Sequence, residues 1–218
     1  MLSPRLKYLQ IALNRPLDES ILMLQLIPQD ERILIEVGTP LLKISGAESI
    51  RMFRNVLGEN RYIVADTKCM DRGATEVDIC ATAGANAATC LALAPLETIN
   101  EFIKKCKEYN IDSMVDMLNV KFPFEILQKL HQKPDVVILH RGVDERYQKE
   151  IPEIPYDQIT RIKSTYNNIL ISIAGGEDFR DVAKTFFNGA DIAIVWEKVY
   201  KNPNQIKILT DEFLKQIR

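Results

Sequence analysis

The sequence predicts an α/β fold of the (β/α)₈ TIM-barrel class, and three observations support this prediction. Short apolar runs alternate with longer amphipathic segments along the chain. This alternation repeats eight times, which is the number that a (β/α)₈ barrel needs. Most of the apolar runs are continuous, as in parallel strands that are buried on both faces. A doubly wound open sheet is the alternative, but it usually has fewer strands, and no G-x-G-x-x-G follows the first run.

The predicted strands are rich in Ile, Val, Leu and Ala. In chain order they are Tyr8–Leu13, Ile33–Val37, Tyr62–Ala65, Ala88–Leu93, Ser113–Leu118, Val136–His140, Ile169–Ala174 and Ile192–Trp196. Helices are predicted where apolar residues recur at a spacing of three or four. The clearest are Gly46–Gly58, Leu96–Tyr109, Asp178–Gly189 and Pro203–Ile217. The longest irregular connection, Arg141–Gln158, has the length of a functional rim or lid.

Composition limits the class of protein. The chain has 218 residues, 46% of them hydrophobic, and shows no linker, so we expect one domain over residues 1–218. A net charge of -2 and a pI of about 5.8 give no reason to expect nucleic acid as a partner. No apolar run reaches membrane-spanning length and no signal-peptide pattern opens the chain, so we expect a cytoplasmic protein without a membrane partner. The four cysteines form no C-x-x-C pair and are expected to be free and buried: Cys69, Cys80, Cys90 and Cys106.

Polar side chains gather where the predicted strands end. In a barrel the loops after the strands form one mouth, so side chains at these ends converge. Charged side chains are costly to bury unless they pair. Several charged side chains that converge on one barrel mouth therefore indicate a functional site. The set is Asn14, Glu36, Asp66, Lys68, Asp116, His140 and Arg141. The seventh strand ends at Gly175 and Gly176, which offer backbone N–H groups of the kind that bind anions. Asp71 lies just beyond Asp66 and Lys68, where it could cap the next helix or reach a partner subunit.

The segment "DTKCMD", Asp66 to Asp71, matches the D-x-K-x-x-D motif of the orotidine 5'-phosphate decarboxylase suprafamily. Four further segments resemble its branch of hexulose-6-phosphate synthases and 3-keto-L-gulonate-6-phosphate decarboxylases. They are "LQIALN", "IEVGTPLLKISG", "HRGVDER" and "ISIAGG", and they follow the family's order over nearly the whole chain.

The resemblance implies roles for single positions. Glu36 and Asp66 match the carboxylates that hold Mg²⁺, an ion that prefers hard oxygen ligands. Lys68 matches the cation beside an enediolate intermediate, and His140 matches the acid/base. Asp71 matches a carboxylate that is contributed across a dimer interface, so the resemblance implies a homodimer with shared active sites.

The resemblance further implies a small sugar phosphate as the substrate. It would be bound by Asn14, Asp116, Arg141, Gly175 and Gly176, while Asp66, Lys68, Asp71 and His140 would act in the chemistry.

One position favours a particular activity. Val143 stands where the decarboxylases carry a second arginine, and Gly142-Val143-Asp144 is more similar to the synthase pattern. We therefore expect a Mg²⁺-dependent carbon–carbon lyase of the aldehyde-lyase kind, which interconverts hexulose 6-phosphate with ribulose 5-phosphate and formaldehyde.

Two departures from the family pattern keep alternatives open. The first strand of the family ends in Asp, whereas this chain has Asn14. The family's phosphate-binding Gly-Arg after the eighth strand is replaced by Trp196-Glu197, and a carboxylate repels phosphate. Lys198 or the Gly175-Gly176 amides could compensate. The alternatives are a decarboxylase or lyase that acts on a different substrate, and a non-catalytic barrel relative.

Overall fold

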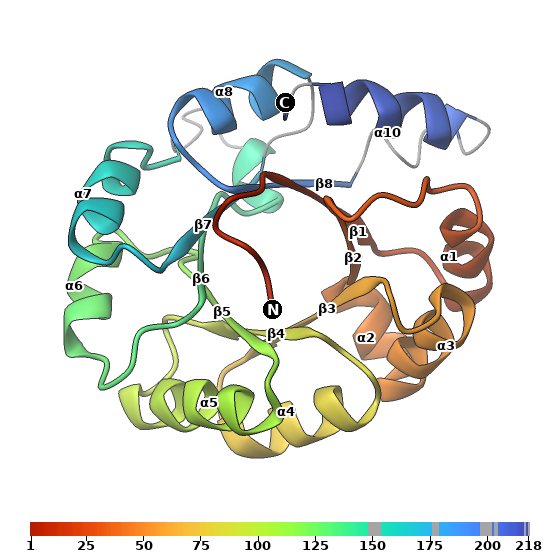
Figure 1. The fold of residues 1–218 in the computed structure, drawn as a ribbon. Helices are drawn as coiled ribbons and strands as arrows, with labels where there is room; N and C mark the ends of the chain where they lie inside the picture. The colour runs from red at the N-terminus through yellow and green to blue at the C-terminus, as the bar shows by residue number, and fades with distance from the viewer. Residues whose placement is uncertain (148–153, 176–178, 197–201, 203–204, 216, 218) are drawn as a thin grey trace.

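Eight parallel strands form a closed barrel with the helices around it, and the predicted (β/α)₈ fold is confirmed. The structure is a computed structural model, and it describes residues 1–218 except 148–153, 176–178, 197–201, 203–204, 216 and 218. Figure 1 shows the strands as an inner ring and the helices as an outer one. The barrel order follows the chain from β1 to β8, and β8 closes on β1 through pairs such as Gln10 with Ile194.

Strands and helices follow one another around the barrel. Because all eight strands are parallel, their carboxyl ends lie at the same mouth of the barrel. The strands are β1 (Tyr8–Leu13), β2 (Ile33–Val37), β3 (Tyr62–Cys69), β4 (Ala87–Leu91), β5 (Asp112–Asp116), β6 (Val136–His140), β7 (Leu170–Ala174) and β8 (Ile192–Val195). The helices are α1 (Leu17–Leu24), α2 (Thr39–Ser45), α3 (Ala47–Leu57), α4 (Gly73–Thr82), α5 (Leu96–Tyr109), α6 (Pro123–Lys129), α7 (Asp157–Thr165), α8 (Phe179–Phe187) and α10 (Ile206–Lys215), with the short 3₁₀ helix η1 (Asp144–Tyr147).

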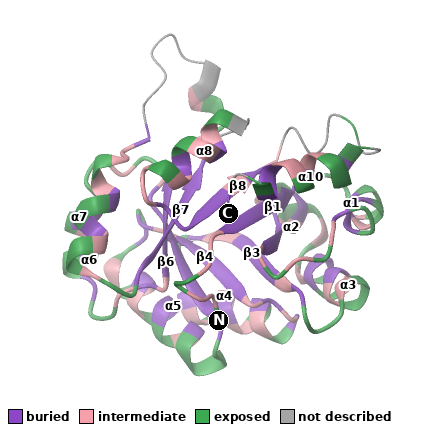
Figure 2. Cartoon of the chain, turned by 45° about the horizontal axis from the view of Figure 1, so that its top comes forward, coloured by how far each residue is buried: buried purple, intermediate pink, exposed green. Residues whose placement is uncertain are grey.

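The strands are apolar on both faces because each face packs against a different cluster. Figure 2 shows the buried strands inside a ring of helices whose outer faces are exposed. One set of strand residues packs against the helices, and the alternate set fills the barrel interior. The interior apolar cluster consists of Tyr8, Leu34, Val64, Ala87, Met114, Val136, Ile138, Leu170, Ala174 and Ile192.

Toward the carboxyl ends of the strands, interior positions change from apolar to polar. Val64 is followed two residues later by Asp66, Met114 by Asp116, and Ile138 by His140. These pairs lie on the same face of their strands because side chains alternate with a period of two. The polar side chains of Asp66, Asp116 and His140 therefore lie directly next to the apolar interior cluster, toward the carboxyl ends of the strands.

The observed β3 is longer than the predicted strand, and the additional residues include Asp66 and Lys68. This strand continues to Cys69 instead of ending at Ala65, because it pairs again with β4 after an irregularity. The segment after β2, for which no helix was predicted, forms helix α2, which has Pro40 in its first turn.

The cysteine prediction is confirmed: Cys69, Cys80, Cys90 and Cys106 are free and buried. No helix within the described part of the chain is long and apolar enough to cross a membrane.

Candidate active site

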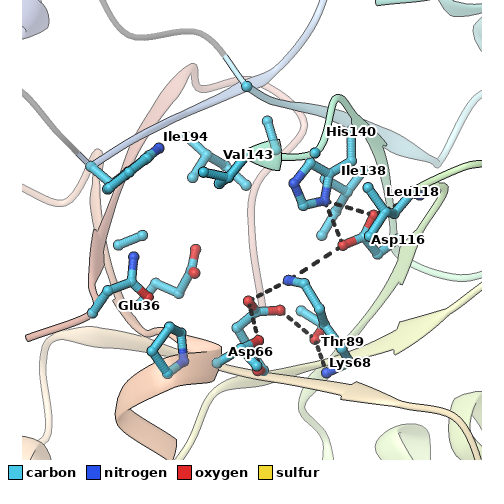
Figure 3. Close-up of a pocket in the computed structure, with 18 of the residues that line it drawn as sticks. Glu36, Asp66, Lys68, Thr89, Asp116, Leu118, Ile138, His140, Val143 and Ile194 are labelled. Carbon is cyan, nitrogen blue, oxygen red and sulfur yellow. Dashed lines mark hydrogen bonds and ion pairs between the residues drawn. The ribbon is translucent and has the colours of Figure 1, made fainter. Parts of the chain in front are cut away.

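A cavity of about 640 Å³ opens at the carboxyl ends of the strands. Figure 3 shows its charged residues facing one another across the barrel mouth. It is lined by Gln10, Ala12, Asn14, Glu36, Thr39, Pro40, Asp66, Lys68, Thr89, Asp116, Leu118, Asn119, Ile138, His140, Gly142, Val143, Asp144, Glu145, Ala174, Gly175, Ile194 and Trp196. A pocket of this size that mixes apolar walls with a few convergent polar groups suits a small ligand.

The cavity has a charged side and an apolar side. Charged groups come from the ends of β2, β3, β5 and β6. The opposite wall is formed by Ala12 of β1, Ala174 of β7 and Ile194 of β8. Two of these are alanines, and their small side chains leave the space that the cavity occupies. A ligand would therefore lie against an apolar wall while its reacting atoms face the charged one.

A bulge in β3 presents Asp66 and Lys68 to the cavity. Ala65 pairs with Ala88, and the next paired residues are Cys69 and Cys90, so β3 carries two extra residues here. Lys68 lies in the left-handed region with φ of 47°. That conformation costs a residue other than glycine on the order of 1–3 kcal/mol and persists only where the surroundings impose it.

Three donors hold the Asp66 carboxylate. Lys68 Nζ lies 2.5 Å from Oδ2, Thr39 Oγ1 donates to Oδ2 at 2.8 Å, and Thr89 Oγ1 donates to Oδ1 at 2.8 Å. Burial alone would raise the pKa of Asp66, but the Lys68 ammonium and these hydrogen bonds outweigh it and hold the pKa below its usual value. Asp66 is therefore an ionised, fixed carboxylate.

The Lys68 ammonium lies between two carboxylates. Its Nζ is 2.5 Å from Asp66 Oδ2 and 3.6 Å from Asp116 Oδ2. Burial would lower the pKa of Lys68, but the negative charges of Asp66, Asp116 and Glu36 raise it above its ordinary value. Lys68 is thus a permanent cation, suited to balance negative charge that develops on a substrate.

His140 is oriented by Asp116. Its Nδ1 lies 2.8 Å from Oδ2 and 3.0 Å from Oδ1 of Asp116, whose side chain is almost fully buried. Asp116 Oδ1 also accepts the backbone N–H of Leu118 at 2.9 Å. Lys68, Asp116 and His140 therefore form one connected network, and Figure 3 follows it along the dashed lines.

Glu36 has a different environment from Asp66. Gln10 Nε2 donates to Glu36 Oε2 at 2.5 Å. Burial, followed by the nearby charge of Asp66, raises the pKa of Glu36 to about 7, although Lys68 and Gln10 act in the opposite direction. The two carboxylates therefore differ in their tendency to ionise, and a cation placed between them would stabilise both charges.

The oxygen atoms of Glu36 and Asp66 are of the hard type that divalent cations such as Mg²⁺ prefer. No cluster of three or more His, Cys, Asp or Glu side chains within the described ranges is arranged to hold a metal. Mg²⁺ does not need such a cluster, because it commonly takes one or two carboxylates and completes its shell with water and substrate. Gln10 Oε1, next to Glu36, is buried without a hydrogen-bond partner, which leaves one more hard oxygen in this position.

The structure brings together most of the residues expected at the site. Seven of them line the cavity: Asn14, Glu36, Asp66, Lys68, Asp116, His140 and Gly175. Gly176, Glu197 and Lys198 lie outside the described residues.

Two of the expected residues do not line the cavity. Arg141 Nη2 donates to the carbonyl of Gly175 at 2.5 Å, and Arg141 is not among the residues that line the cavity. Asp71 is exposed, and its Oδ1 accepts the N–H of Arg72. The idea that Asp71 caps α4 is wrong, since Arg72 occupies the cap position and no side chain caps the helix.

Three lining residues that hydrogen-bond to the carboxylates were missed from the sequence. Gln10 lies inside β1, Thr39 follows β2, and Thr89 lies inside β4. Gln10 and Thr89 are each 1% exposed, and a polar residue in the middle of an apolar run was the available signal.

Comparisons with known proteins identify the family of the chain. The sequence profile of the orotidine 5'-phosphate decarboxylase / HUMPS family matches residues 7–209. The chain belongs to this family. Within it, the chain is similar to the bifunctional enzyme Fae/Hps of Methanothrix thermoacetophila, with 38% identity over 212 residues. That match covers 97% of this chain and 53% of the relative, so the chain spans about half the length of the curated relatives it matches.

Solved structures of family members share the barrel. The 3-hexulose-6-phosphate synthase from Salmonella typhimurium has a TM-score of 0.82 at 25% identity, and the match covers 96% of this chain and 99% of that one. KGPDC from Streptococcus mutans in complex with D-R5P has a TM-score of 0.83 at 22% identity, with 96% of each chain covered. At the latter identity the likeness concerns the fold alone.

Proposed function

We propose that this chain is a carbon–carbon lyase of the aldehyde-lyase kind, which interconverts hexulose 6-phosphate with ribulose 5-phosphate and formaldehyde. The charge balance of the cavity carries this proposal. Among the described lining residues the only permanent cation is Lys68, and five are acidic: Glu36, Asp66, Asp116, Asp144 and Glu145. A cavity of this charge favours an uncharged electrophile, such as formaldehyde, over the additional carboxylate that a decarboxylase substrate carries. The 38% identity with an Fae/Hps enzyme supports the same choice.

His140 would move the proton in this reaction. Its Nδ1 faces Asp116, which leaves Nε2 as the nitrogen available to a ligand. In the synthetic direction, Nε2 takes a proton from C1 of ribulose 5-phosphate, and the electron pair remains on the enediolate. C1 then forms the bond to the formaldehyde carbon, and the resulting alkoxide takes the proton from His140.

Lys68 would stabilise the enediolate. It is held between Asp66 and Asp116 before any ligand binds, so little reorganisation is needed when charge develops. The apolar wall of Ala12, Ala174 and Ile194 keeps water away from the carbanion-like carbon, which would otherwise be protonated in place of reacting with the aldehyde.

A divalent cation, Mg²⁺, would be held by Glu36 and Asp66. When bound, such an ion supplies Lewis-acid stabilisation of substrate oxygens. The pKa of Glu36 near 7 and the unpartnered Gln10 Oε1 support a cation at this position. We also propose that the chain acts in the cytoplasm as a homodimer, in which Asp71 reaches Lys68 of the partner subunit; the exposed position of Asp71 is compatible with this arrangement.

The test is to mix the protein with ¹³C-formaldehyde, ribulose 5-phosphate and Mg²⁺ and to follow hexulose 6-phosphate by NMR. We expect product with Mg²⁺, none in excess chelator, and none from Glu36→Gln, whose thermal unfolding should stay close to that of the unaltered protein. Conversion of 3-keto-L-gulonate 6-phosphate without any use of formaldehyde would show the decarboxylase instead. Turnover of neither substrate, or full activity in chelator, would contradict the proposal.

A further inference from the structure

Thr89 of β4 opposes the whole bulge that carries the charged pair. Between the pairs Ala65–Ala88 and Cys69–Cys90, three residues of β3 face this single residue of β4. Thr89 is 1% exposed and lines the cavity floor.

Thr89 contacts each of the three bulge residues. Its Oγ1 donates to Asp66 Oδ1 at 2.8 Å and accepts the backbone N–H of Lys68 at 2.9 Å. Its carbonyl accepts a hydrogen bond from Thr67 Oγ1 at 2.5 Å. Figure 3 shows the hydroxyl between the Asp66 carboxylate and the Lys68 backbone.

A side-chain hydroxyl thus takes the place of the strand-to-strand hydrogen bonds that the bulge removes. An ordinary ladder would pair the Lys68 N–H with a backbone carbonyl. Here Lys68 has a φ of 47°, outside the range of a regular strand, and its N–H donates to Thr89 Oγ1 instead. A hydroxyl can donate and accept at the same time, and this position requires both.

We propose that Thr89 is a positioning residue, which fixes the β3 bulge so that Asp66 and Lys68 keep the geometry that the reaction needs. It acts through those two residues and does not have to touch the substrate. Thr39 provides the natural comparison, because its hydroxyl bonds Asp66 Oδ2 and the Asp66 carbonyl but not the Lys68 backbone.

The experiment compares four variants: Thr89→Val, Thr89→Ser, Thr39→Val and, as a remote control, Thr82→Val, whose hydroxyl bonds only helix carbonyls on the exposed surface of α4. Valine keeps the shape and removes the hydroxyl, and serine keeps the hydroxyl. We expect Thr89→Val to lower kcat about tenfold or more with a smaller change in KM, because two hydrogen bonds are lost, one of them to a charged group. Thr89→Ser should recover most of kcat, and Thr82→Val should leave it unchanged.

The kinetic measurements rest on the proposed function. A crystal structure of Thr89→Val tests the positioning role independently of that function. We expect Lys68 to leave the left-handed region and its Nζ to move away from Asp66. If Lys68 keeps its position and φ in that structure, the proposal is wrong whether or not the protein is an aldehyde-lyase. The proposal would also be overturned if Thr89→Ser lowered kcat as much as Thr89→Val does. It would be overturned as well if Thr39→Val lowered kcat as much as Thr89→Val does while Lys68 stayed in place in the Thr89→Val structure. An inactive unaltered protein together with a displaced Lys68 would overturn only the proposed function.

Discussion

His140 Nδ1 lies 2.8 Å from Oδ2 of Asp116, and both Asp116 oxygens are within hydrogen-bond distance of the same ring nitrogen. A carboxylate accepts hydrogen bonds, so a neutral His140 ring would carry its proton on Nδ1, and Nε2 is the nitrogen that does not bond Asp116. Asp116 also lies 3.6 Å from Lys68 Nζ. One buried carboxylate therefore contacts both the His140 ring and the Lys68 ammonium.

The first prediction concerns this contact. In Asp116→Asn the amide can donate to Nδ1, which would favour the tautomer with Nε2 protonated and unable to accept a proton. We expect kcat to fall by about tenfold to a hundredfold, since a positioned acid/base contributes in this range or above it. Steady-state kinetics measures the change, and thermal unfolding serves as the folding control. An unchanged kcat in a folded variant would show that His140 does not act as the base.

The second prediction is a pH dependence of stability in the metal-free protein. The pKa of Glu36 is raised from 4.5 to about 7 in the folded state. Between these values the folded protein binds the proton that the unfolded chain has released. The free energy of unfolding should therefore fall as pH rises through this window, by an amount on the order of 3 kcal/mol at most.

Urea denaturation in excess chelator at several pH values measures this slope. Glu36→Gln is the matched control, because glutamine does not titrate and should lack this part of the pH dependence. The same slope in both proteins would mean that Glu36 ionises normally in the folded state.

The third prediction concerns Gly38 and Asn14. A Cβ on Gly38 would lie 1.9 Å from Asn14 Oδ1 and 2.8 Å from its Cγ. Gly38→Ala must therefore move the Asn14 side chain, which is flexible and lines the cavity. We expect a small loss of stability together with a several-fold rise in KM. Asn14→Ala and the double variant complete a mutant cycle. If the two effects on KM add fully, Gly38 does not act through Asn14.

The fourth prediction concerns Trp196 and Glu197 after β8. Trp196 lines the cavity, and Glu197 lies outside the described residues. If these residues weaken phosphate binding, the pair Trp196→Gly and Glu197→Arg should bind ribulose 5-phosphate at least about tenfold more tightly, since a charge-assisted hydrogen bond contributes roughly 1.5–3 kcal/mol. Calorimetric titration of both proteins measures this. Equal affinities would show that other groups, such as Lys198 or the Gly175 turn, hold the phosphate.

The fifth prediction concerns Asp71. The protein should sediment as a dimer at micromolar concentration, and Asp71→Ala should lower kcat while Lys68 keeps its contact with Asp66. Mixing Asp71→Ala with Lys68→Ala should restore part of the activity, because each mixed dimer has one complete site. A monomer with full activity would contradict shared sites.

The sequence by itself determined the barrel and most of the charged residues at its mouth. Strand and helix periodicities are local properties, and in a parallel barrel every strand ends on the same side, so Glu36, Asp66 and His140 had to converge. The expectation of a single domain over residues 1–218 stays a prediction, as do the roles given to the site residues.

Only the tertiary structure decided how these residues are held. The β3 bulge depends on pairing with a strand about twenty residues away, as loss of register at Ala65 shows. The left-handed Lys68 has no local signal, because lysine does not favour that conformation. Thr89 and Gln10 acquire their partners only when strands that are far apart in the sequence pair side by side, and Arg141 reaches the Gly175 carbonyl for the same reason. Sequence periodicity places a side chain on a face, whereas its hydrogen bonds are set by contacts between distant strands.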